Sequence, residues 1–159
     1  MIIKSFELNK IDYSKNKFFL LYGENQGHKN QIIDEKFKKI YSESTYCYDE
    51  NEILNNQEDF FSNILTKSFF EKEKLIIVSR VTDKIKDLVE EIVVKNIKDI
   101  TIVLKSDILE KKSKLRILFE KNKETICVPF YEDNNQTLSS IVNLFFRERK
   151  IPISQQLIN

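Results

Sequence analysis

The sequence predicts a three-layer α/β domain, in which a parallel β-sheet is covered by helices on both faces. Short apolar runs alternate along the chain with amphipathic stretches of helical period, as in right-handed β-α-β units. Two of these runs, at residues 75–78 and 100–104, are almost continuously apolar. Such runs are typical of strands that are buried on both faces of a parallel sheet.

The elements of this domain can be assigned in chain order. Strands are expected at residues 18–22, 45–48, 74–79, 100–104 and 126–130, and helices at residues 29–39 and 58–65. From Ile85 to Val93, apolar residues recur at the spacing of one helical face, which predicts an amphipathic helix before the fourth strand. Asp107, with Glu110 three residues later, has the pattern of a helix start and predicts a helix with the apolar residues Ile108, Leu115, Leu118 and Phe119.

The pattern changes after residue 130. A polar connector at residues 131–136 predicts a boundary, and residues 137–150 predict a helix with one apolar face, formed by Leu138, Ile141, Val142 and Phe145. Pro152 ends this helix, and Ser154 would cap another one that has barely begun when the chain stops at Asn159. We therefore expect one domain over residues 1–134 and the first helices of a truncated helical domain over residues 135–159.

The composition argues against several classes of protein. The net charge is +1, with 26 basic and 25 acidic residues, so there is no global basic field of the kind that attracts nucleic acid. One histidine, His28, and two widely spaced cysteines, Cys47 and Cys127, argue against a structural zinc site. Both cysteines are expected to be small buried hydrophobes in a reducing cytosol. Charges interrupt the apolar residues at the N-terminus, so neither a signal peptide nor a membrane span is predicted there.

The two glycines of the chain lie in one stretch, residues 23–27, between the first expected strand and the helix that follows it. A chain this poor in glycine indicates that the backbone requires glycine at both positions. Strand, glycine-bearing turn and helix N-terminus together form the layout of a phosphate-binding loop. The candidate residues of this loop are Gly23, Asn25, Gly27 and Lys29.

The residues that would make this loop an ATPase are missing. When Lys29 is aligned with the lysine of the phosphate-loop pattern, His28 replaces a glycine and Asn30 replaces the hydroxyl residue that holds magnesium. The strand at residues 74–79 ends in Ser79 and Arg80, with no acidic pair to hold the metal and orient water. No catalytic residue, metal or cofactor is therefore expected. Two interpretations remain open: a tight turn with a solvated lysine, or binding of an anion or nucleotide without turnover.

The order and spacing of these motifs resemble the N-terminal region of the delta subunit of the bacterial DNA polymerase III clamp loader, over nearly the whole chain. The resemblance rests on residues 19–25 (FLLYGEN), on residues 68–70 (SFF) before the third strand, and on residues 104–111 (LKSDILEK). The closing helices resemble the start of the family's helical lid. The resemblance implies an AAA+-like domain without ATPase activity and a sheet of strand order 5-1-4-3-2. That order would place Cys47 and Cys127 on opposite edges of the sheet, too far apart for a disulfide.

The resemblance also implies a function. Clamp-loader delta subunits belong to the DNA polymerase III holoenzyme, a DNA-directed DNA polymerase of the bacterial cytoplasm. The subunit binds the ring-shaped sliding clamp, the beta subunit, and holds it open. The other loader subunits hydrolyse ATP, and the assembly as a whole meets primer–template DNA. No membrane is involved. A small P-loop ATPase or kinase is the alternative that the glycine loop leaves open.

The family's clamp-binding element lies just before the third strand and presents a pair of hydrophobic residues. The resemblance assigns this role to Phe69 and Phe70, preceded by Lys67 and Ser68. Two adjacent large apolar side chains on a helix cannot both face inward, so at least one is expected to be exposed or to fill a pocket of a partner. Burial would contribute roughly 1.5–3 kcal/mol for each ring. The alternative is that both rings pack under the sheet, as expected for residues 60 and 61.

Overall fold

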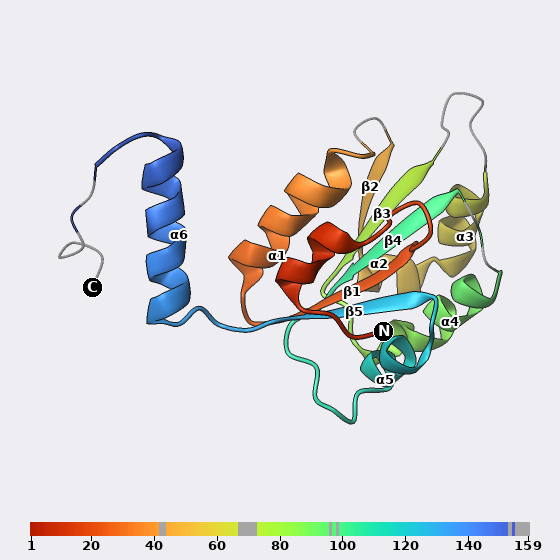
Figure 1. Ribbon diagram of the computed structural model, residues 1–159. Helices are drawn as coiled ribbons and strands as arrows, with labels where there is room; N and C mark the ends of the chain where they lie inside the picture. Colours follow the sequence, from red (N-terminus) through yellow and green to blue (C-terminus); the bar gives the residue numbers. More distant parts are fainter. Residues whose placement is uncertain (42–43, 67–72, 96, 98, 153, 155–159) are drawn as a thin grey trace.

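A computed structural model describes the chain except residues 42–43, 67–72, 96, 98, 153 and 155–159 (Figure 1). Its strands form one parallel five-stranded sheet in the order β2-β3-β4-β1-β5. The strands are β1 (Phe18–Gly23), β2 (Thr45–Asp49), β3 (Lys74–Ser79), β4 (Ile100–Lys105) and β5 (Thr125–Phe130). Every strand lies within one residue of its expected bounds, and the order is the one that the resemblance implied, 5-1-4-3-2, counted from the other edge.

Helices cover both faces of the sheet and make the fold three-layered (Figure 1). One face carries α2 (Glu50–Asn55), α3 (Gln57–Leu65), the short turn η3 (Asp83–Ile85), α4 (Lys86–Lys95) and α5 (Lys114–Lys121). The other face carries η1 (Ser5–Lys10) and α1 (Gln26–Ile32), which continues into the π-helical turn η2 (Ile33–Lys38). The three-layer class predicted from the sequence is confirmed.

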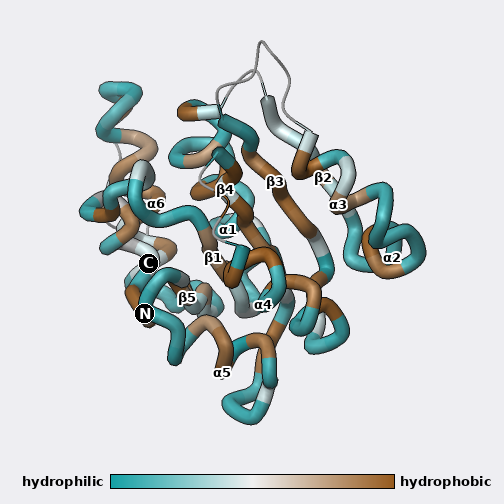
Figure 2. Tube along the Cα trace, turned by 90° about the vertical axis from the view of Figure 1, so that its right-hand side faces the viewer, coloured by the Kyte–Doolittle hydropathy of each residue, from teal (hydrophilic) through white to brown (hydrophobic). Residues whose placement is uncertain are grey.

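Alternation along the strands divides the apolar side chains between two cores. In β1, Phe18 and Leu20 pack against the α4 and α5 layer, whereas Phe19 and Leu21 pack against α1 and η2. Figure 2 shows hydrophobic residues along β3 and β4 in the middle of the sheet. Because both faces are covered, each central strand is an almost continuous apolar run, as the sequence indicated.

Two helices differ from the prediction, and the capping residues at their N-termini explain where they begin. The helix after β1 begins at residue 26, earlier than the expected residue 29, because the Asn25 side chain accepts a hydrogen bond from the His28 amide at 3.0 Å. Helix α2 was not predicted. It begins with a capping box: the Asp49 side chain accepts a hydrogen bond from the Glu52 amide, and the Glu52 side chain accepts one from the Asp49 amide.

The expected helix start at Asp107 and Glu110 is wrong. Residues 106–113 contain no helix, Ile108 is exposed, and α5 begins only at Lys114. The backbone carbonyl of Asp107 instead accepts a hydrogen bond from the Gly23 amide at 2.9 Å, which holds the chain beside β1. The true start of the helix is set by Ser113, whose hydroxyl accepts from the Arg116 amide at 3.2 Å.

The two cysteines differ in their environment. Cys127 lies in β5 and is fully buried, as expected, but Cys47 is exposed, so the expectation that both are buried is wrong for this residue. Cys47 belongs to the edge strand β2 and is not among the residues that pack against α1 and η2. Both thiols are free, and they lie on opposite edges of the sheet, as the topology requires.

Helix α6 (Asn135–Glu148) stands apart from the three-layered body (Figure 1). The helix was expected from residue 137, and it begins two residues earlier because Asn134 and Thr137 form a reciprocal cap. None of its residues is buried, and several large apolar side chains are exposed: Leu138, Ile141, Leu144 and Phe145. The second helix expected after Ser154 falls outside the described residues. Within the described part of the chain, no helix has the length and apolar character needed to cross a membrane.

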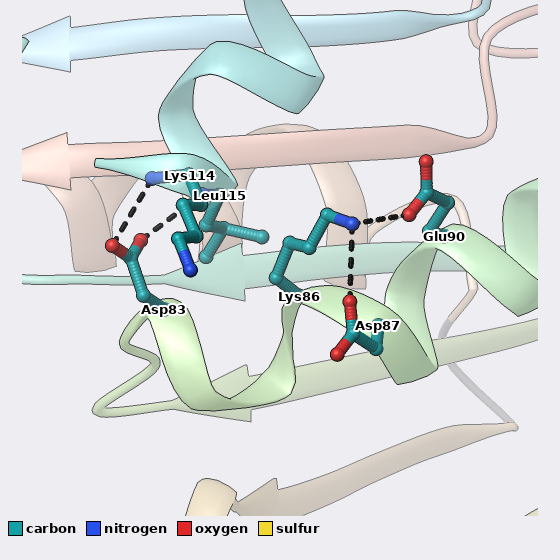
Figure 3. Close-up of polar contacts among 6 residues, drawn as sticks. All are labelled: Asp83, Lys86, Asp87, Glu90, Lys114 and Leu115. Atoms are coloured by element: carbon teal, nitrogen blue, oxygen red, sulfur yellow. Dashed lines mark hydrogen bonds and ion pairs between the residues drawn. The ribbon is translucent and has the colours of Figure 1, made fainter. Parts of the chain in front are cut away.

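We predict that Asp83→Ala lowers the free energy of unfolding by about 1 kcal/mol at neutral pH, the usual cost of losing a helix cap. The Asp83 carboxylate accepts hydrogen bonds from the backbone amides of Lys114 and Leu115, both at 3.0 Å (Figure 3). It also accepts one from the Ser113 hydroxyl at 2.6 Å. It therefore joins η3 to the first turn of α5. Urea denaturation measures the change. Asp87→Ala is the matched control, because this carboxylate is exposed and pairs with Lys86 on its own helix (Figure 3). An equal loss in both variants would contradict the prediction.

The same contacts make the contribution of Asp83 to folding stability depend on pH. Burial alone would raise the pKa of Asp83, but hydrogen bonds from Ser113, Leu115 and Lys114 outweigh it and lower the pKa below its ordinary value of 3.8. A carboxylate whose pKa is lowered by folding stabilises the folded state above the ordinary pKa. This stabilisation is lost as the pH falls below 3.8 through the lowered pKa, so the difference between Asp83→Ala and the wild type should shrink there.

Candidate functional site

The candidate phosphate loop lies at the carboxyl edge of the sheet, where the ends of β1, β4 and β5 meet the N-terminus of α1. Parallel strands end at the same edge, and ligand sites of open α/β sheets are found there. Backbone hydrogen bonds tie the turn to both neighbouring strands: the Gly23 amide donates to the Asp107 carbonyl at 2.9 Å, and the Asn25 amide donates to the Phe130 carbonyl at 3.4 Å. The loop is therefore held in one place by the strands on either side.

The two glycines have different roles. Gly23 has a φ of +122°, and a Cβ at this position would lie 2.1 Å from the Phe130 carbonyl oxygen. Only glycine allows β5 to pass this close to β1. A Cβ on Gly27 would meet only the Asn25 side-chain oxygen, at 3.8 Å, which is an ordinary contact. The expectation that the backbone requires glycine is thus confirmed for Gly23 and wrong for Gly27.

Lys29 is completely buried, so the interpretation as a turn with a solvated lysine is wrong. Its Nζ donates hydrogen bonds to the backbone carbonyl of Gly23 at 2.6 Å and to that of Ser106 at 2.5 Å. Burial lowers the pKa of the Lys29 ammonium, the nearby Asp107 carboxylate opposes this shift, and Lys105 adds to it. The amine that would contact a phosphate in an active loop here joins the end of β1 to the end of β4.

The N-terminus of α1 already faces carboxylates of the protein itself. The Asn25 Nδ2 donates to Asp133 at 2.7 Å, and the Gln26 amide side chain donates to the Asp107 carboxylate. A helix N-terminus favours nearby negative charge, and these two internal acids supply it. Bringing a second anion to the same place would set it against both carboxylates.

An open groove of about 1050 Å³ runs between this loop and α6. It is lined by Asn25, His28 and Phe130 on one side and by Thr137 and Ile141 on the other. The charged side chains along it are one lysine and two acids: Lys4, Glu132 and Asp133. A groove with this charge does not attract a polyphosphate.

Of the two positions that would hold magnesium, one is bonded to a lysine and the other is itself an arginine. The Asn30 side-chain oxygen accepts a hydrogen bond from Lys105 Nζ at 3.1 Å. Arg80, which follows β3 where an acid is required, is exposed, has a φ of +56° and forms an ion pair with Asp49. Among the residues that the structure describes, no three His, Cys, Asp or Glu side chains are grouped as a metal site would need. The two positions that the phosphate-loop pattern assigns to magnesium are thus occupied by an amide bonded to a lysine and by an arginine.

The candidate clamp-binding residues Lys67, Ser68, Phe69 and Phe70 all lie outside the described residues. The chain on either side of them is described: α3 ends at Leu65, and β3 begins at Lys74. Since β3 starts there, this part of the chain is at the amino edge of the sheet. The described residues that flank this candidate site, Thr66 and Glu73, are thus near the edge of the sheet opposite the phosphate loop.

Several residues at the phosphate loop were not found by sequence reasoning. Ser106 and Phe130 act through backbone carbonyls, which carry no signal in the side-chain pattern. Asp107 was noticed for a different reason, as a helix start, and Asp133 was taken as part of a polar connector. These residues become partners of the loop only because β4 and β5 flank β1 in the sheet.

The strand order 5-1-4-3-2, the helices on both faces and the glycine turn before α1 define an AAA+-like P-loop fold. No family model matches the chain, and no curated protein matches it by sequence. Among solved structures, the chain is similar to the Bacillus subtilis DNA clamp loader delta protein (YqeN), with a TM-score of 0.62 and 15% identity, over 96% of this chain and 49% of that one. It thus spans about half the length of the Bacillus protein. A second similar structure is domain III of the Thermotoga maritima replication initiation protein DnaA, with a TM-score of 0.46 and 15% identity, over 97% of this chain and 70% of that one.

We predict that Gly23→Ala lowers the free energy of unfolding by at least about 2 kcal/mol, because it adds both backbone strain and a clash with Phe130. Gly27→Ala is the matched control. It places alanine in a helix without a close contact and should be neutral or stabilising by up to about 1 kcal/mol. Urea denaturation of both variants measures this difference, and equal losses of stability would show that our account of the loop is incorrect.

Proposed function

We propose that this chain is part of a clamp-loader subunit without ATPase activity that binds and opens the sliding clamp during DNA replication. The proposal is carried by the similarity of the fold to the Bacillus subtilis clamp loader delta protein over 96% of the chain. At 15% identity that similarity concerns the fold alone. The motifs at residues 19–25, 68–70 and 104–111, which resemble the delta family, point to the same function independently.

The state of the carboxyl edge supports a subunit that does not hydrolyse ATP. The Lys29 ammonium is bound to two backbone carbonyls, and the Asn30 side chain is bound to Lys105. Internal carboxylates occupy the N-terminus of α1. A clamp-loader subunit of this kind would contribute binding surface while its neighbours supply the chemistry.

In this proposal, residues 1–134 form the clamp-binding domain, and residues 135–159 are the first helices of a lid. The exposed apolar face of α6 is consistent with a lid whose other helices belong to the remainder of a longer protein. The partners are the sliding clamp, or beta subunit, and the other clamp-loader subunits. Primer–template DNA is met through the assembly. The subunit would act in the cytoplasm as part of the DNA polymerase III holoenzyme, without catalysis of its own and without a cofactor.

The clamp contact is assigned to Phe69 and Phe70, with Lys67 and Ser68 before them. The neighbouring pair on α3 illustrates the physical argument. Phe60 is buried and packs against Tyr48 with ring centroids 5.1 Å apart, whereas Phe61 is only partly buried at the edge of the same core. Adjacent aromatic residues of α3 are thus not buried equally. Aromatic anchors of this kind dominate binding energy in interfaces.

We predict that the double variant Phe69→Ala and Phe70→Ala weakens binding to the cognate clamp by at least about 100-fold, because two buried rings together contribute roughly 3–6 kcal/mol. Surface plasmon resonance with immobilised clamp measures the affinity. The matched control replaces the aromatic pair Phe145 and Phe146 of α6 by alanine and should bind as the wild type does. Unchanged affinity of the Phe69 and Phe70 variant would remove these residues from the interface.

The alternative function is a P-loop ATPase or kinase, and we expect it to fail a direct assay. The wild-type protein should not hydrolyse ATP, and its melting temperature should not change with magnesium and ATP, since the loop lysine already has internal partners. Turnover that disappears in Lys29→Ala but persists in Lys38→Ala would support the enzyme instead. Lys38 is a suitable control because its ion pair with Asp34 lies on η2, away from the loop.

A further inference from the structure

A second open groove, of about 580 Å³, lies on the helical layer formed by α4 and α5. The two helices pack against each other on the same face of the sheet (Figure 1). The side chains that line the groove include two from α4 and four from α5: Lys86 and Glu90, and Lys114, Ile117, Leu118 and Lys121. It shares no lining residue with the groove beside α6, and the proposed function gives it no role.

The wall that α5 contributes is one face of that helix. Counted from Lys114, the residues Ile117, Leu118 and Lys121 lie three, four and seven positions along, the spacing that brings side chains to one side of a helix. Leu118 packs against the core of the α4 and α5 layer, whereas the half-buried Ile117 belongs to neither of the two described cores. The groove thus has apolar surface between two lysines.

The lysines of the two walls differ in their charge partners. The Lys86 ammonium forms ion pairs with Glu90 and with a second carboxylate of its own helix, so the α4 wall carries no excess of positive charge (Figure 3). Lys114 and Lys121 are exposed, and neither forms an ion pair with a residue that the structure describes. Asp83 adjoins Lys114, but its carboxylate already accepts three hydrogen bonds at the start of α5.

We propose that this groove binds an acidic segment of a partner protein, with large apolar side chains against Ile117 and Leu118 and carboxylates beside Lys114 and Lys121. Amphipathic segments bind in this way, because apolar residues fill a groove between helices and charges at its rim select the partner. The aliphatic stems of the lysines extend the apolar surface while their ammonium groups stay in water.

The same charges favour a protein segment over a nucleic acid. A nucleic-acid strand carries one negative charge about every 3.4 Å, and it would meet the Glu90 carboxylate on the opposite wall of the groove. It would also leave the apolar surface of Ile117 facing phosphates. A peptide with a few carboxylates around an apolar anchor matches two lysines and an apolar floor without either conflict.

The probe is a fluorescein-labelled amphipathic peptide with leucine on one helical face and glutamate on both sides of it. Fluorescence anisotropy at physiological ionic strength measures its affinity for the protein, and we expect saturable binding. Two control peptides carry alanine in place of leucine, or lysine in place of glutamate. Each should bind at least about tenfold more weakly, because the first lacks the apolar anchors and the second has the wrong charge.

Variants of the protein assign the binding to the groove. Lys114→Gln combined with Lys121→Gln should raise the dissociation constant of the glutamate peptide by about three- to tenfold. Ile117→Ser should raise it by about five- to tenfold. The matched control, Lys10→Gln combined with Lys39→Gln, removes the same charge from exposed positions in the other helical layer and should bind as the wild type does.

The results expected above support the inference, and three others overturn it. One is unchanged affinity of the Lys114 and Lys121 variant, whatever the Ile117 variant does. Another is an equal loss in both double lysine variants, which would assign the effect to total charge. The third is a single-stranded oligodeoxythymidylate that displaces the peptide and binds at least as tightly, which would assign the groove to nucleic acid. None of these measurements involves the clamp, so the inference holds or fails independently of the proposed function.

Discussion

The arrangement of the carboxyl edge of the sheet depends on the hydrogen bonds of the Lys29 ammonium group. It reaches from α1 to the carbonyl of Gly23 at the end of β1 and to that of Ser106 just after β4, and it is fully buried between them. A buried charge without partners costs several kcal/mol, so the buried ammonium needs hydrogen bonds to these two carbonyls. The arrangement works because Gly23 lets β5 approach β1 without a side chain between them. The turn, the start of α1 and the ends of three strands are thus one connected unit.

This connection changes what the edge can do. In a working phosphate loop, a lysine and a helix N-terminus point toward a ligand. Here the lysine points to the backbone, and the helix N-terminus contacts Asp107 and Asp133 through Gln26 and Asn25. Each feature that attracts a nucleotide is therefore occupied by another part of the same chain. The consequence is a fold of the P-loop class in which these contacts stabilise the turn and the start of α1.

The amino edge of the sheet offers a different kind of organisation. Lys74 donates to the Thr66 carbonyl after α3, and Lys17 forms an ion pair with Glu73 just before β3. Charged contacts of this kind are directional and hold geometry more than they add stability. The two edges thus differ in their contacts: buried backbone carbonyls bind a lysine at the carboxyl edge, and partly exposed ion pairs and hydrogen bonds join the chain to the strands at the amino edge.

Local pattern was sufficient for most of the secondary structure. Apolar runs and helical spacing located all five strands and the helices around Ile64, Val89 and Phe119, because burial on a fixed period leaves a direct trace in the sequence. The sheet order came from the family resemblance and the structure bears it out. The start of α5 was misplaced because Asp107 and Glu110 match the pattern of a helix start, whereas the N-cap is Ser113. The Asp83 carboxylate, which accepts hydrogen bonds from the first amides of this helix, is adjacent to it only after folding. The environment of Lys29 was likewise decided by tertiary structure. The sequence pattern of a lysine after a glycine turn is the same whether the lysine faces solvent, a phosphate or two carbonyls. Only the packing of β4 beside β1 supplies the Ser106 carbonyl and removes the water that would otherwise surround the charge.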